Sequence, residues 1–280
     1  MKKVKLYIFT AGYCTCPEHI AIKGGRYQNI RFPAMFAYIE HPNFGGMLFD
    51  TGYSNKFFTE TATLPAKFYR LLTPVTLQEE QLAINQLAKI NVRPSDITRI
   101  FISHFHADHI SALGDFPKAK FSYLAGAYDA IKKLNGMRAL SHAFLPGLLP
   151  HDFADRSEPI LSSPIPLPPE FFPFTAGYDL LGDNSIIAVE LPGHATGQMG
   201  IFCQNTDNKI FFFIADAAWL KNNVINNTPP HWITNLLFTN PTAYKTTLNN
   251  LHILANVAQQ YTIIPSHCEE TLIKFSYKSE

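Results

Sequence analysis

Residues 101–109 read Phe-Ile-Ser-His-Phe-His-Ala-Asp-His, an apolar run that leads directly into the spacing His-x-His-x-Asp-His. The apolar part predicts a buried strand. Side chains alternate along a strand, so His104 and His106 should point the same way, while Asp108 and His109 fall in the turn or helix start that follows. A cluster of this kind suits two metal ions close together.

Three further residues of the types that bind metals follow apolar runs elsewhere in the chain. His194 lies in the glycine-bracketed loop 191–198, Asp216 ends the run 211–215, and His267 follows the predicted strand 261–264. A single His or Asp at a strand end is usually a capping or hydrogen-bonding residue. Taken together with the first motif, the three complete a set of seven candidate metal ligands.

The pattern along the chain predicts a layered α/β protein. Apolar, β-rich runs predict strands at 4–9, 36–39, 46–49, 100–103, 185–191, 199–203, 209–214 and 261–264. A helix is predicted from Thr76, which forms a capping-box pattern with Glu79, to near Asn91, and another over 241–260. Because strands and helices are mixed rather than grouped, we expect residues 1–280 to form a single domain with two similar halves.

A segment rich in proline and phenylalanine, about 141–178, connects the two halves. Proline fixes φ and removes a backbone donor, so the segment should be irregular and stiff. Its aromatic side chains, Phe144 and Phe153 among them, either pack on the body of the domain or flank the site and contact substrate. The sequence leaves both alternatives open.

Composition and hydrophobic pattern argue against nucleic-acid and membrane partners. The 23 Lys and Arg balance 22 Asp and Glu, so no overall basic field attracts a nucleic-acid backbone, and no nucleic-acid partner is expected. No apolar run reaches 18 residues, and the run at 4–10 is too short for a signal peptide. The sequence therefore predicts a cytoplasmic protein without a membrane partner.

The cysteines are too few and too unevenly spaced for a disulfide framework. Cys14 and Cys16, with His19 nearby, raise the alternative of a small metal site. A structural zinc site would need a second Cys or His pair at suitable spacing, which the neighbouring sequence lacks. Two small buried thiols are the preferred interpretation.

The ordered ligand set resembles that of the metallo-β-lactamase superfamily, and residues 48–52, Leu-Phe-Asp-Thr-Gly, resemble the early Asp-Thr-Gly turn of that family. The resemblance implies an αββα four-layer sandwich of two mixed β-sheets flanked by helices. It implies two Zn²⁺ per chain, with iron or manganese as alternatives. By the same resemblance, His104, His106 and His194 would bind one ion, Asp108, His109 and His267 would bind the second, and Asp216 would bridge the two. Asp50 resembles the carboxylate that orients a ligand histidine, or is a simple turn former.

Such a centre implies a hydrolase. Two Zn²⁺ with two carboxylates and a bridging hydroxide leave a net positive charge, which favours an anionic transition state. Zinc lowers the pKa of bound water from about 15.7 toward 7. Asp108 would then pass a proton from the attacking hydroxide to the leaving group.

Length and motif order are closest to the N-acyl homoserine lactone lactonase branch, which implies a small-molecule ester or lactone as substrate. Related thioesterases add a C-terminal helical region, and related nucleases need a basic surface, neither of which the sequence suggests. Many lactonases of this branch have a tyrosine three residues after the bridging aspartate, where this chain has Trp219. Trp219 is either a hydrogen-bond donor to substrate or a packing residue. Thioesterase, phosphodiesterase or sulfatase activity and a non-catalytic metal-binding module remain alternatives.

Overall fold

The computed structural model describes residues 1–258 and 260–277. The first half of the chain forms a mixed group of strands in the spatial order β6-β5-β3-β2-β1, with short β4 beside β1. The bounds are β1 (Lys3–Pro17), β2 (Asn29–His41), β3 (Gly45–Phe49), β4 (Val75–Thr76), β5 (Ile97–Phe101) and β6 (Lys120–Ser122). The predicted strands are present, and β1 and β2 are longer than the apolar runs suggested.

The second half forms another mixed group, in which β10 lies between β9 and β11 and β12 pairs with β11. The bounds are β7 (Ile165–Pro166), β8 (Ala176–Asp179), β9 (Ile186–Glu190), β10 (Met199–Asn205), β11 (Ile210–Ala215) and β12 (Tyr261–Pro265). The start of β1 pairs in parallel with the end of β10, at Lys3–Gln204 and Val4–Asn205. The two groups of strands are therefore parts of one continuous sheet.

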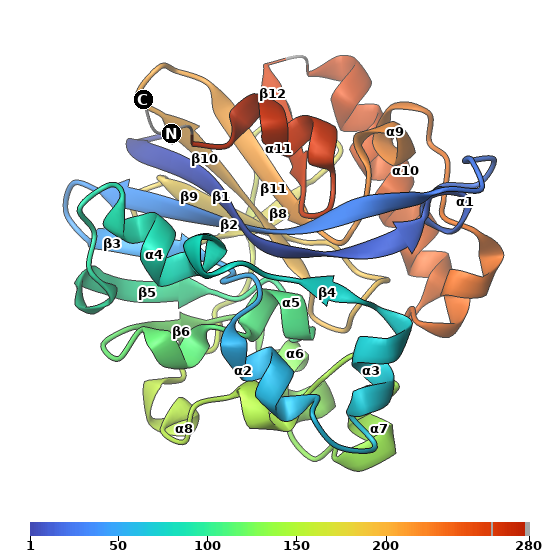
Figure 1. The fold of residues 1–280 in the computed structure, drawn as a ribbon. Coiled ribbons are helices and arrows are strands. Elements are labelled where there is room, and N and C mark those ends of the chain that lie inside the picture. Colours follow the sequence, from blue (N-terminus) through green and yellow to red (C-terminus); the bar gives the residue numbers. More distant parts are fainter. Residues whose placement is uncertain (259, 278–280) are drawn as a thin grey trace.

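Helices cover the outer face of each group of strands (Figure 1). In the first half they are α2 (Asn55–Glu60), α3 (Lys67–Leu72), α4 (Ala83–Ala88), α5 (Ala107–Ile110), α6 (Ala125–Ile131), α7 (Gly136–Leu140) and α8 (Phe153–Arg156). The short α1 (Glu18–Ala21) lies instead at the end of the β1–β2 hairpin, where Ala21 accepts a hydrogen bond from Asn223 of the second half. In the second half they are α9 (Lys221–Ile225), α10 (Pro241–Val257) and α11 (Glu269–Phe275). No helix in the described part of the chain is both long and apolar enough to cross a bilayer.

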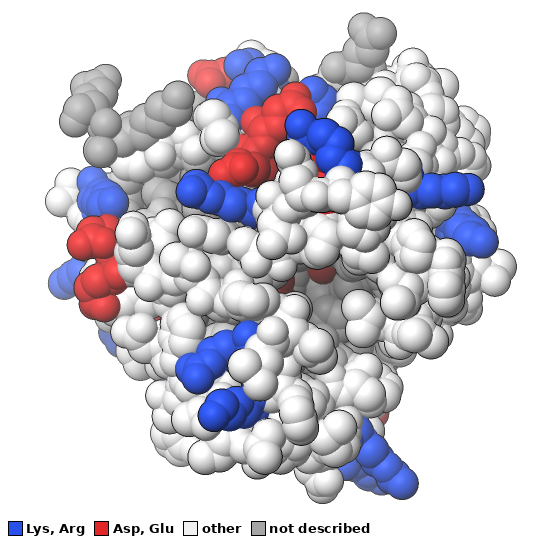
Figure 2. Space-filling view, turned by 45° about the vertical axis from the view of Figure 1, so that its right-hand side comes forward, with Lys and Arg blue, Asp and Glu red and all other residues white. Residues whose placement is uncertain are grey.

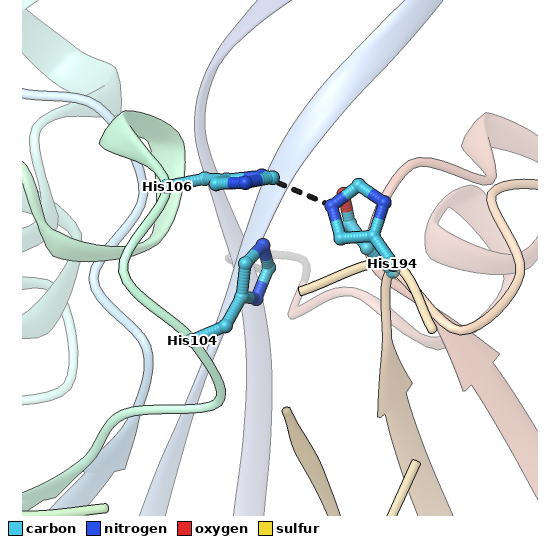
Figure 3. Close-up of side chains that lie close together, drawn as sticks. His104, His106 and His194 are labelled. Atoms are coloured by element: carbon cyan, nitrogen blue, oxygen red, sulfur yellow. Dashed lines mark hydrogen bonds and ion pairs between the residues drawn. The ribbon is translucent and has the colours of Figure 1, made fainter. Parts of the chain in front are cut away.

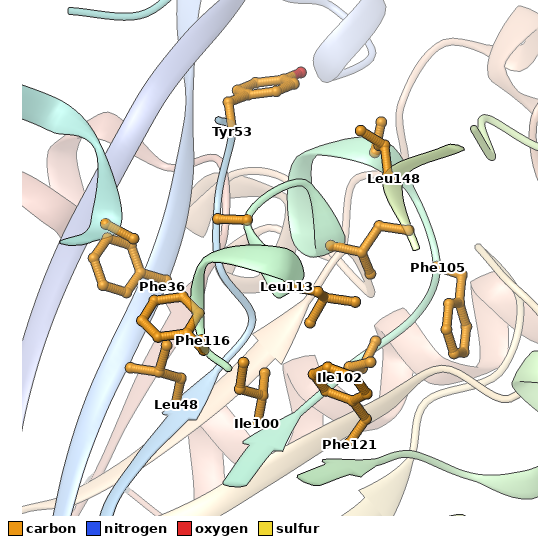
Figure 4. Close-up of a cluster of buried hydrophobic side chains, with 14 of the residues drawn as sticks. Phe36, Leu48, Tyr53, Ile100, Ile102, Phe105, Leu113, Phe116, Phe121 and Leu148 are labelled. Carbon is orange, nitrogen blue, oxygen red and sulfur yellow. The ribbon is translucent and has the colours of Figure 1, made fainter. Parts of the chain in front are cut away.

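Alternate residues of single strands face different hydrophobic clusters, which shows the layering directly. Leu48 of β3 faces the cluster beneath the first-half helices, whereas Phe49 faces a central cluster that also holds Phe213 of β11. Phe212 of β11 faces a third cluster together with Leu251 of α10. The order is helices, strands, strands, helices, as the family resemblance implied; Figure 4 shows the first of these clusters.

The predicted helix from Thr76 to Asn91 is wrong in its start and in its length. Thr76 is in β4, where it pairs with Tyr13 of β1, and no helix begins directly after it. The backbone N–H of Gln78 instead donates to the side chain of Gln81, and the regular helix α4 covers only Ala83–Ala88. Strand pairing with β1 outweighed the local capping pattern.

The 141–178 segment is irregular but contains short elements. They are the 3-10 helix η4 (Pro146–Leu148), α8, β7, the 3-10 helix η5 (Pro169–Phe171) and most of β8. Much of the segment packs onto the two halves, since Phe144 and Leu148 lie in the first-half cluster and Phe171 and Phe174 in the second-half cluster.

Candidate metal centre

The candidate ligands gather where parallel strands end at the same edge of the sheet. β3 and β5 are parallel neighbours, so Asp50 follows Phe49 beside the segment that leads from β5 to His104. β11 and β12 are also parallel neighbours, with Ala215 opposite Pro265, which places Asp216 and His267 side by side. The structure thus brings together residues from four separate parts of the chain.

The motif at 104–109 has the local geometry that its spacing predicts. His104 and His106 lie on the chain after β5, with ring centroids 4.4 Å apart. Asp108 and His109 are in α5, one helical turn that begins directly after His106. β5 ends at Phe101, before the end of the predicted strand at Ser103, so the motif supplies ligand side chains from the loop after a strand and from a helix start.

His194 approaches from the loop between β9 and β10. The preceding Gly193 has φ +132°, and a Cβ at that position would lie 2.2 Å from the backbone nitrogen of Tyr244 in α10. Only glycine fits so close to another backbone with this conformation. The backbone N–H of Asn240 donates to the Gly193 carbonyl, which helps to hold the loop against the start of α10.

The seven side chains form two groups, within each of which the possible ligand atoms lie no more than 4.8 Å apart. One group is His104, His106, His194 and Asp216; the other is Asp108, His109 and His267. Figure 3 shows the three histidines of the first group converging, with His194 Nε2 3.0 Å from His106 Nδ1.

Asp216 lies between the two groups. Its Oδ2 is 3.2 Å from Nε2 of His194, in the first group. Its Oδ1 is 3.2 Å from Nε2 of His109 and 3.1 Å from Nε2 of His267, both in the second. One carboxylate thus faces ligand nitrogens on both sides.

Three of the buried atoms that face the centre have no hydrogen-bond partner: His104 Nε2, His109 Nε2 and Asp216 Oδ1. A buried polar atom without a partner costs about 1–3 kcal/mol. Imidazole nitrogens and a carboxylate oxygen that converge in this way form the donor set that Zn²⁺ prefers. The residues present therefore fit a metal centre.

The environment keeps the first group of histidines neutral. Burial, together with neighbouring histidines, lowers the pKa of His104 well below its usual range. Burial also lowers the pKa of His106 to about 4 and that of His194 well below normal. Because a metal ligand must be deprotonated, this environment favours metal binding near neutral pH.

The second group is more strongly influenced by carboxylates. Burial opposes charge on His109, but Asp108, Asp50 and Asp216 outweigh it and raise the pKa of His109 well above normal. The reverse holds for Asp216, where burial opposes the charge but His267, His109 and His194 lower the pKa well below its usual range. Without a bound ion, these shifts favour a positively charged His109 and a negatively charged Asp216.

Asp50 is fully buried and contacts His109. Its Oδ2 lies 2.8 Å from His109 Nδ1, and its two oxygens accept hydrogen bonds from the backbone and hydroxyl of Ser103, each at 2.8 Å. This contact leaves Nε2 of His109 facing Asp216. Asp50 does more than form a turn.

His267 is held by residues that the sequence analysis did not identify. Its Nδ1 lies 2.8 Å from the Pro33 carbonyl oxygen, and its ring stacks on Phe32 at 5.1 Å between centroids. Both contacts come from β2, more than two hundred positions earlier in the chain. Nothing in the local pattern around either segment indicates this pairing.

A cavity of about 390 Å³ opens onto both ligand groups. Its floor includes His106, Asp108, His194, Asp216 and His267. Its walls are largely apolar and include Phe32, Tyr53, Tyr69, Leu72, Leu140, Trp219 and Leu237. Figure 2 shows the molecule from the side on which this hollow opens, with uncharged residues around it. We call this cavity the central pocket.

Trp219 lies in the pocket wall and is 7% exposed. Its Nε1 donates a hydrogen bond to Oδ2 of Asp216 at 3.3 Å. Its ring packs edge-on against Phe32 and Phe238, at 5.7 Å in each case. Trp219 is therefore both a packing residue and a donor to the carboxylate between the two groups.

Phe144 and Phe153 are not brought to the central pocket. Both are buried in the first-half hydrophobic cluster, and Phe153 stacks on Phe121 at 5.1 Å. From the 141–178 segment, the pocket is lined by Ser141 and Ala143. Of the two alternatives that the sequence left open, the structure shows packing for these two phenylalanines.

Cys14 and Cys16 are free thiols that line the pocket. Burial raises the pKa of both, that of Cys16 to about 11. Within residues 1–258 and 260–277, neither belongs to a cluster of three or more metal-binding side chains. Cys14 is buried, as expected, whereas Cys16 is only half-buried.

Comparison with known proteins agrees with the resemblance to the metallo-β-lactamase superfamily. The family model described as the metallo-beta-lactamase superfamily matches residues 37–209. N-acyl homoserine lactonase AttM of Rhizobium radiobacter is 26% identical over 244 residues, which cover 83% of this chain and 80% of that protein. N-acyl homoserine lactonase AiiA of Bacillus thuringiensis subsp. kurstaki is 22% identical over 233 residues, 80% of each chain.

Solved structures share the fold at lower identity. An N-acyl homoserine lactone hydrolase, solved with the product N-hexanoyl-L-homoserine at its catalytic metal centre, superposes with a TM-score of 0.71 at 18% identity. The superposition covers 98% of this chain and 97% of that one. At this identity the likeness establishes the arrangement of strands and helices.

Proposed function

Since the chain belongs to the metallo-β-lactamase superfamily, we propose that it is a dinuclear zinc hydrolase of a small lactone or ester, with N-acyl homoserine lactones as the first candidates. The observation that carries the proposal is the position of Asp216, whose two oxygens face ligand nitrogens of both groups at 3.1–3.2 Å. One carboxylate between two sets of histidines is an arrangement suited to two ions.

In this proposal His104, His106 and His194 hold one ion, Asp108, His109 and His267 hold the other, and Asp216 is shared. Nitrogen-rich groups of this kind favour zinc, and iron or manganese are alternatives. Asp50 positions His109 through its 2.8 Å contact with Nδ1. The Pro33 carbonyl does the same for His267.

When bound, the ions would supply a nucleophilic hydroxide near neutral pH and polarise the scissile carbonyl. The remaining tasks fall to the side chains of the chain itself. Asp108 lies at the pocket floor, and its Oδ2 is 3.4 Å from His267 Nε2 and 3.6 Å from His109 Nε2. A carboxylate in this place can accept a proton from the nucleophile and return it to the leaving alkoxide.

The pocket supports a substrate with an apolar part. Its volume of about 390 Å³ is in the range of small-molecule sites. Phe32, Leu140 and Leu237 offer apolar walls beyond the metal groups, where an acyl chain would lie. The relatives AttM and AiiA are named as N-acyl homoserine lactonases, which supports the same substrate class here.

The test is a hydrolysis panel on zinc-loaded protein, with acyl homoserine lactones, simple esters, thioesters and phosphodiesters. We expect turnover of lactones, two metals per chain by mass spectrometry, and loss of at least one metal together with activity in Asp216→Ala. Asp129→Asn, a change of an exposed carboxylate on α6, is the matched control and should keep both. Faster turnover of thioesters or phosphodiesters would transfer the assignment to those classes. Metal binding without any turnover would indicate a binding module.

A further inference from the structure

Two short segments at the mouth of the central pocket expose large apolar side chains. One is α3, and the other is the 3-10 helix η6 (Trp232–Leu236) with the residue that follows it. Leu72 and Leu237 line the pocket and are nevertheless 80% and 58% exposed. We define the apolar rim as Phe68, Leu71, Leu72, Trp232, Leu236 and Leu237, all of which are exposed.

The packing of the molecule does not account for the rim. α3 contains no buried residue, and its inward contact is made by Tyr69, which packs on Phe57 and lines the pocket. Single exposed leucines are common on protein surfaces, but several large apolar side chains exposed on two segments that line the same pocket indicate an interaction site. The rim is continuous with the apolar wall of the pocket, because Leu72 and Leu237 belong to both.

The charged residues within the two segments have one sign. α3 reads Lys-Phe-Tyr-Arg-Leu-Leu, and neither Lys67 nor Arg70 forms an ion pair within the described residues. η6 reads Trp-Ile-Thr-Asn-Leu and carries no charge. Tryptophan, phenylalanine and leucine beside unpaired lysine and arginine are the composition of segments that lie at a membrane interface. Cations beside such apolar groups complement anionic lipid headgroups.

We propose that the apolar rim docks the mouth of the central pocket onto an anionic lipid surface. Phe68, Leu71, Trp232 and Leu236 would enter the interfacial region, and Lys67 and Arg70 would face the headgroups. An amphiphilic substrate with a long acyl chain could then pass from the lipid into the pocket along Leu72 and Leu237. This consequence rests on the proposed function, whereas the docking does not.

The inference departs from the expectation of no membrane partner. That expectation rested on the lack of a long apolar run, which excludes a spanning segment. Docking at a surface needs only exposed side chains. The short sequences 67–72 and 232–237 do not reveal whether their apolar residues are buried, and the folded structure shows that most are exposed.

The chain has two tryptophans, which allow a direct test. Trp232 is 69% exposed in the rim, while Trp219 is buried in the pocket wall. On addition of phosphatidylglycerol vesicles we expect the emission to shift to the blue and to be quenched by brominated lipid. Both effects should be absent in Trp232→Phe. Zwitterionic phosphatidylcholine vesicles should bind at least tenfold more weakly.

Flotation with the same vesicles provides the second readout. The double variant Leu71→Ser/Leu236→Ser should lose vesicle binding at least tenfold while it still hydrolyses a short, water-soluble substrate. The matched control Leu161→Ser/Ile273→Ser changes exposed apolar residues outside the rim and should bind as the wild type does. Vesicle binding is measured without substrate, so a failure of docking is distinct from a failure of the proposed hydrolysis.

Three results would overturn the proposal. The first is no vesicle binding by the wild type, and the second is equal binding to zwitterionic and anionic vesicles. The third is a wild-type dimer in sedimentation that the Leu71→Ser/Leu236→Ser variant lacks, which would show that a second copy of the chain covers the rim.

Discussion

The indole Nε1 of Trp219 donates to Oδ2 of Asp216 at 3.3 Å, so the tryptophan contacts the carboxylate that lies between the two ligand groups. The same Oδ2 is 3.2 Å from Nε2 of His194. The N–H of Trp219 is therefore directed to Asp216, and the geometry favours a role in positioning that carboxylate over a role as donor to the substrate carbonyl.

Replacement of Trp219 by phenylalanine should weaken metal binding. The variant keeps an aromatic ring in the wall but removes one hydrogen bond to a carboxylate, and loss of such outer contacts typically lowers metal affinity about 10-fold or more. The measurement is zinc retention during titration with a chelator. Trp232→Phe, at the surface, is the control and should retain zinc as the wild type does. Unchanged zinc affinity together with a lower kcat/KM would instead assign the indole to the substrate.

Asp50→Asn should selectively weaken the second metal position. Asp50 accepts from Ser103 and contacts His109 Nδ1, and a neutral amide supports that histidine less well. We expect a roughly 10–100-fold loss of affinity for one ion while the other is retained. Stepwise zinc titration by calorimetry measures the two affinities. Equal loss at both positions would mean that Asp50 supports the fold of the site rather than His109.

The metal-free protein should lose stability in mild acid through His106. Burial lowers the pKa of His106 from 6.5 in the unfolded chain to about 4 in the folded chain. The unfolded state therefore takes up the proton first, so this contribution to stability is present above about pH 6.5 and is lost as the pH falls toward about 4. The melting temperature of the chelator-treated wild type should fall more over this range than that of His106→Asn, which does not titrate. Parallel curves for the two proteins would contradict the prediction.

Truncation of the pocket wall should depend on acyl-chain length. Leu140 lines the central pocket, and burial of each substrate methylene contributes about 0.8 kcal/mol. In Leu140→Ala, KM should rise more for long-chain than for short-chain lactones. Phe144→Leu provides the contrast, because Phe144 is buried outside the pocket and its loss should affect all chain lengths alike. If the KM of Phe144→Leu also depended on chain length, Phe144 would contact the substrate after all.

Sequence spacing could predict the ligand-bearing segments because the relevant geometry is local. Alternation along an extended chain directs His104 and His106 to one side, and a helix that begins directly after them brings in Asp108 and His109. Apolar runs that stop at a polar residue marked His194, Asp216 and His267 for the same reason. The helix predicted from Thr76 is wrong because Thr76 pairs with Tyr13, far away in sequence, and the regular helix begins only at Ala83.

The tertiary structure alone decided which residues meet. The Pro33 carbonyl behind His267, the indole of Trp219 on Asp216, and the walls from α3 and η6 all depend on the packing of segments far apart in the chain. The same packing placed Phe144 and Phe153 in the core and left Leu72 and Leu237 exposed at the pocket mouth. A hydrophobic pattern shows that a side chain favours burial, but which apolar residues are buried depends on how the layers close around one another.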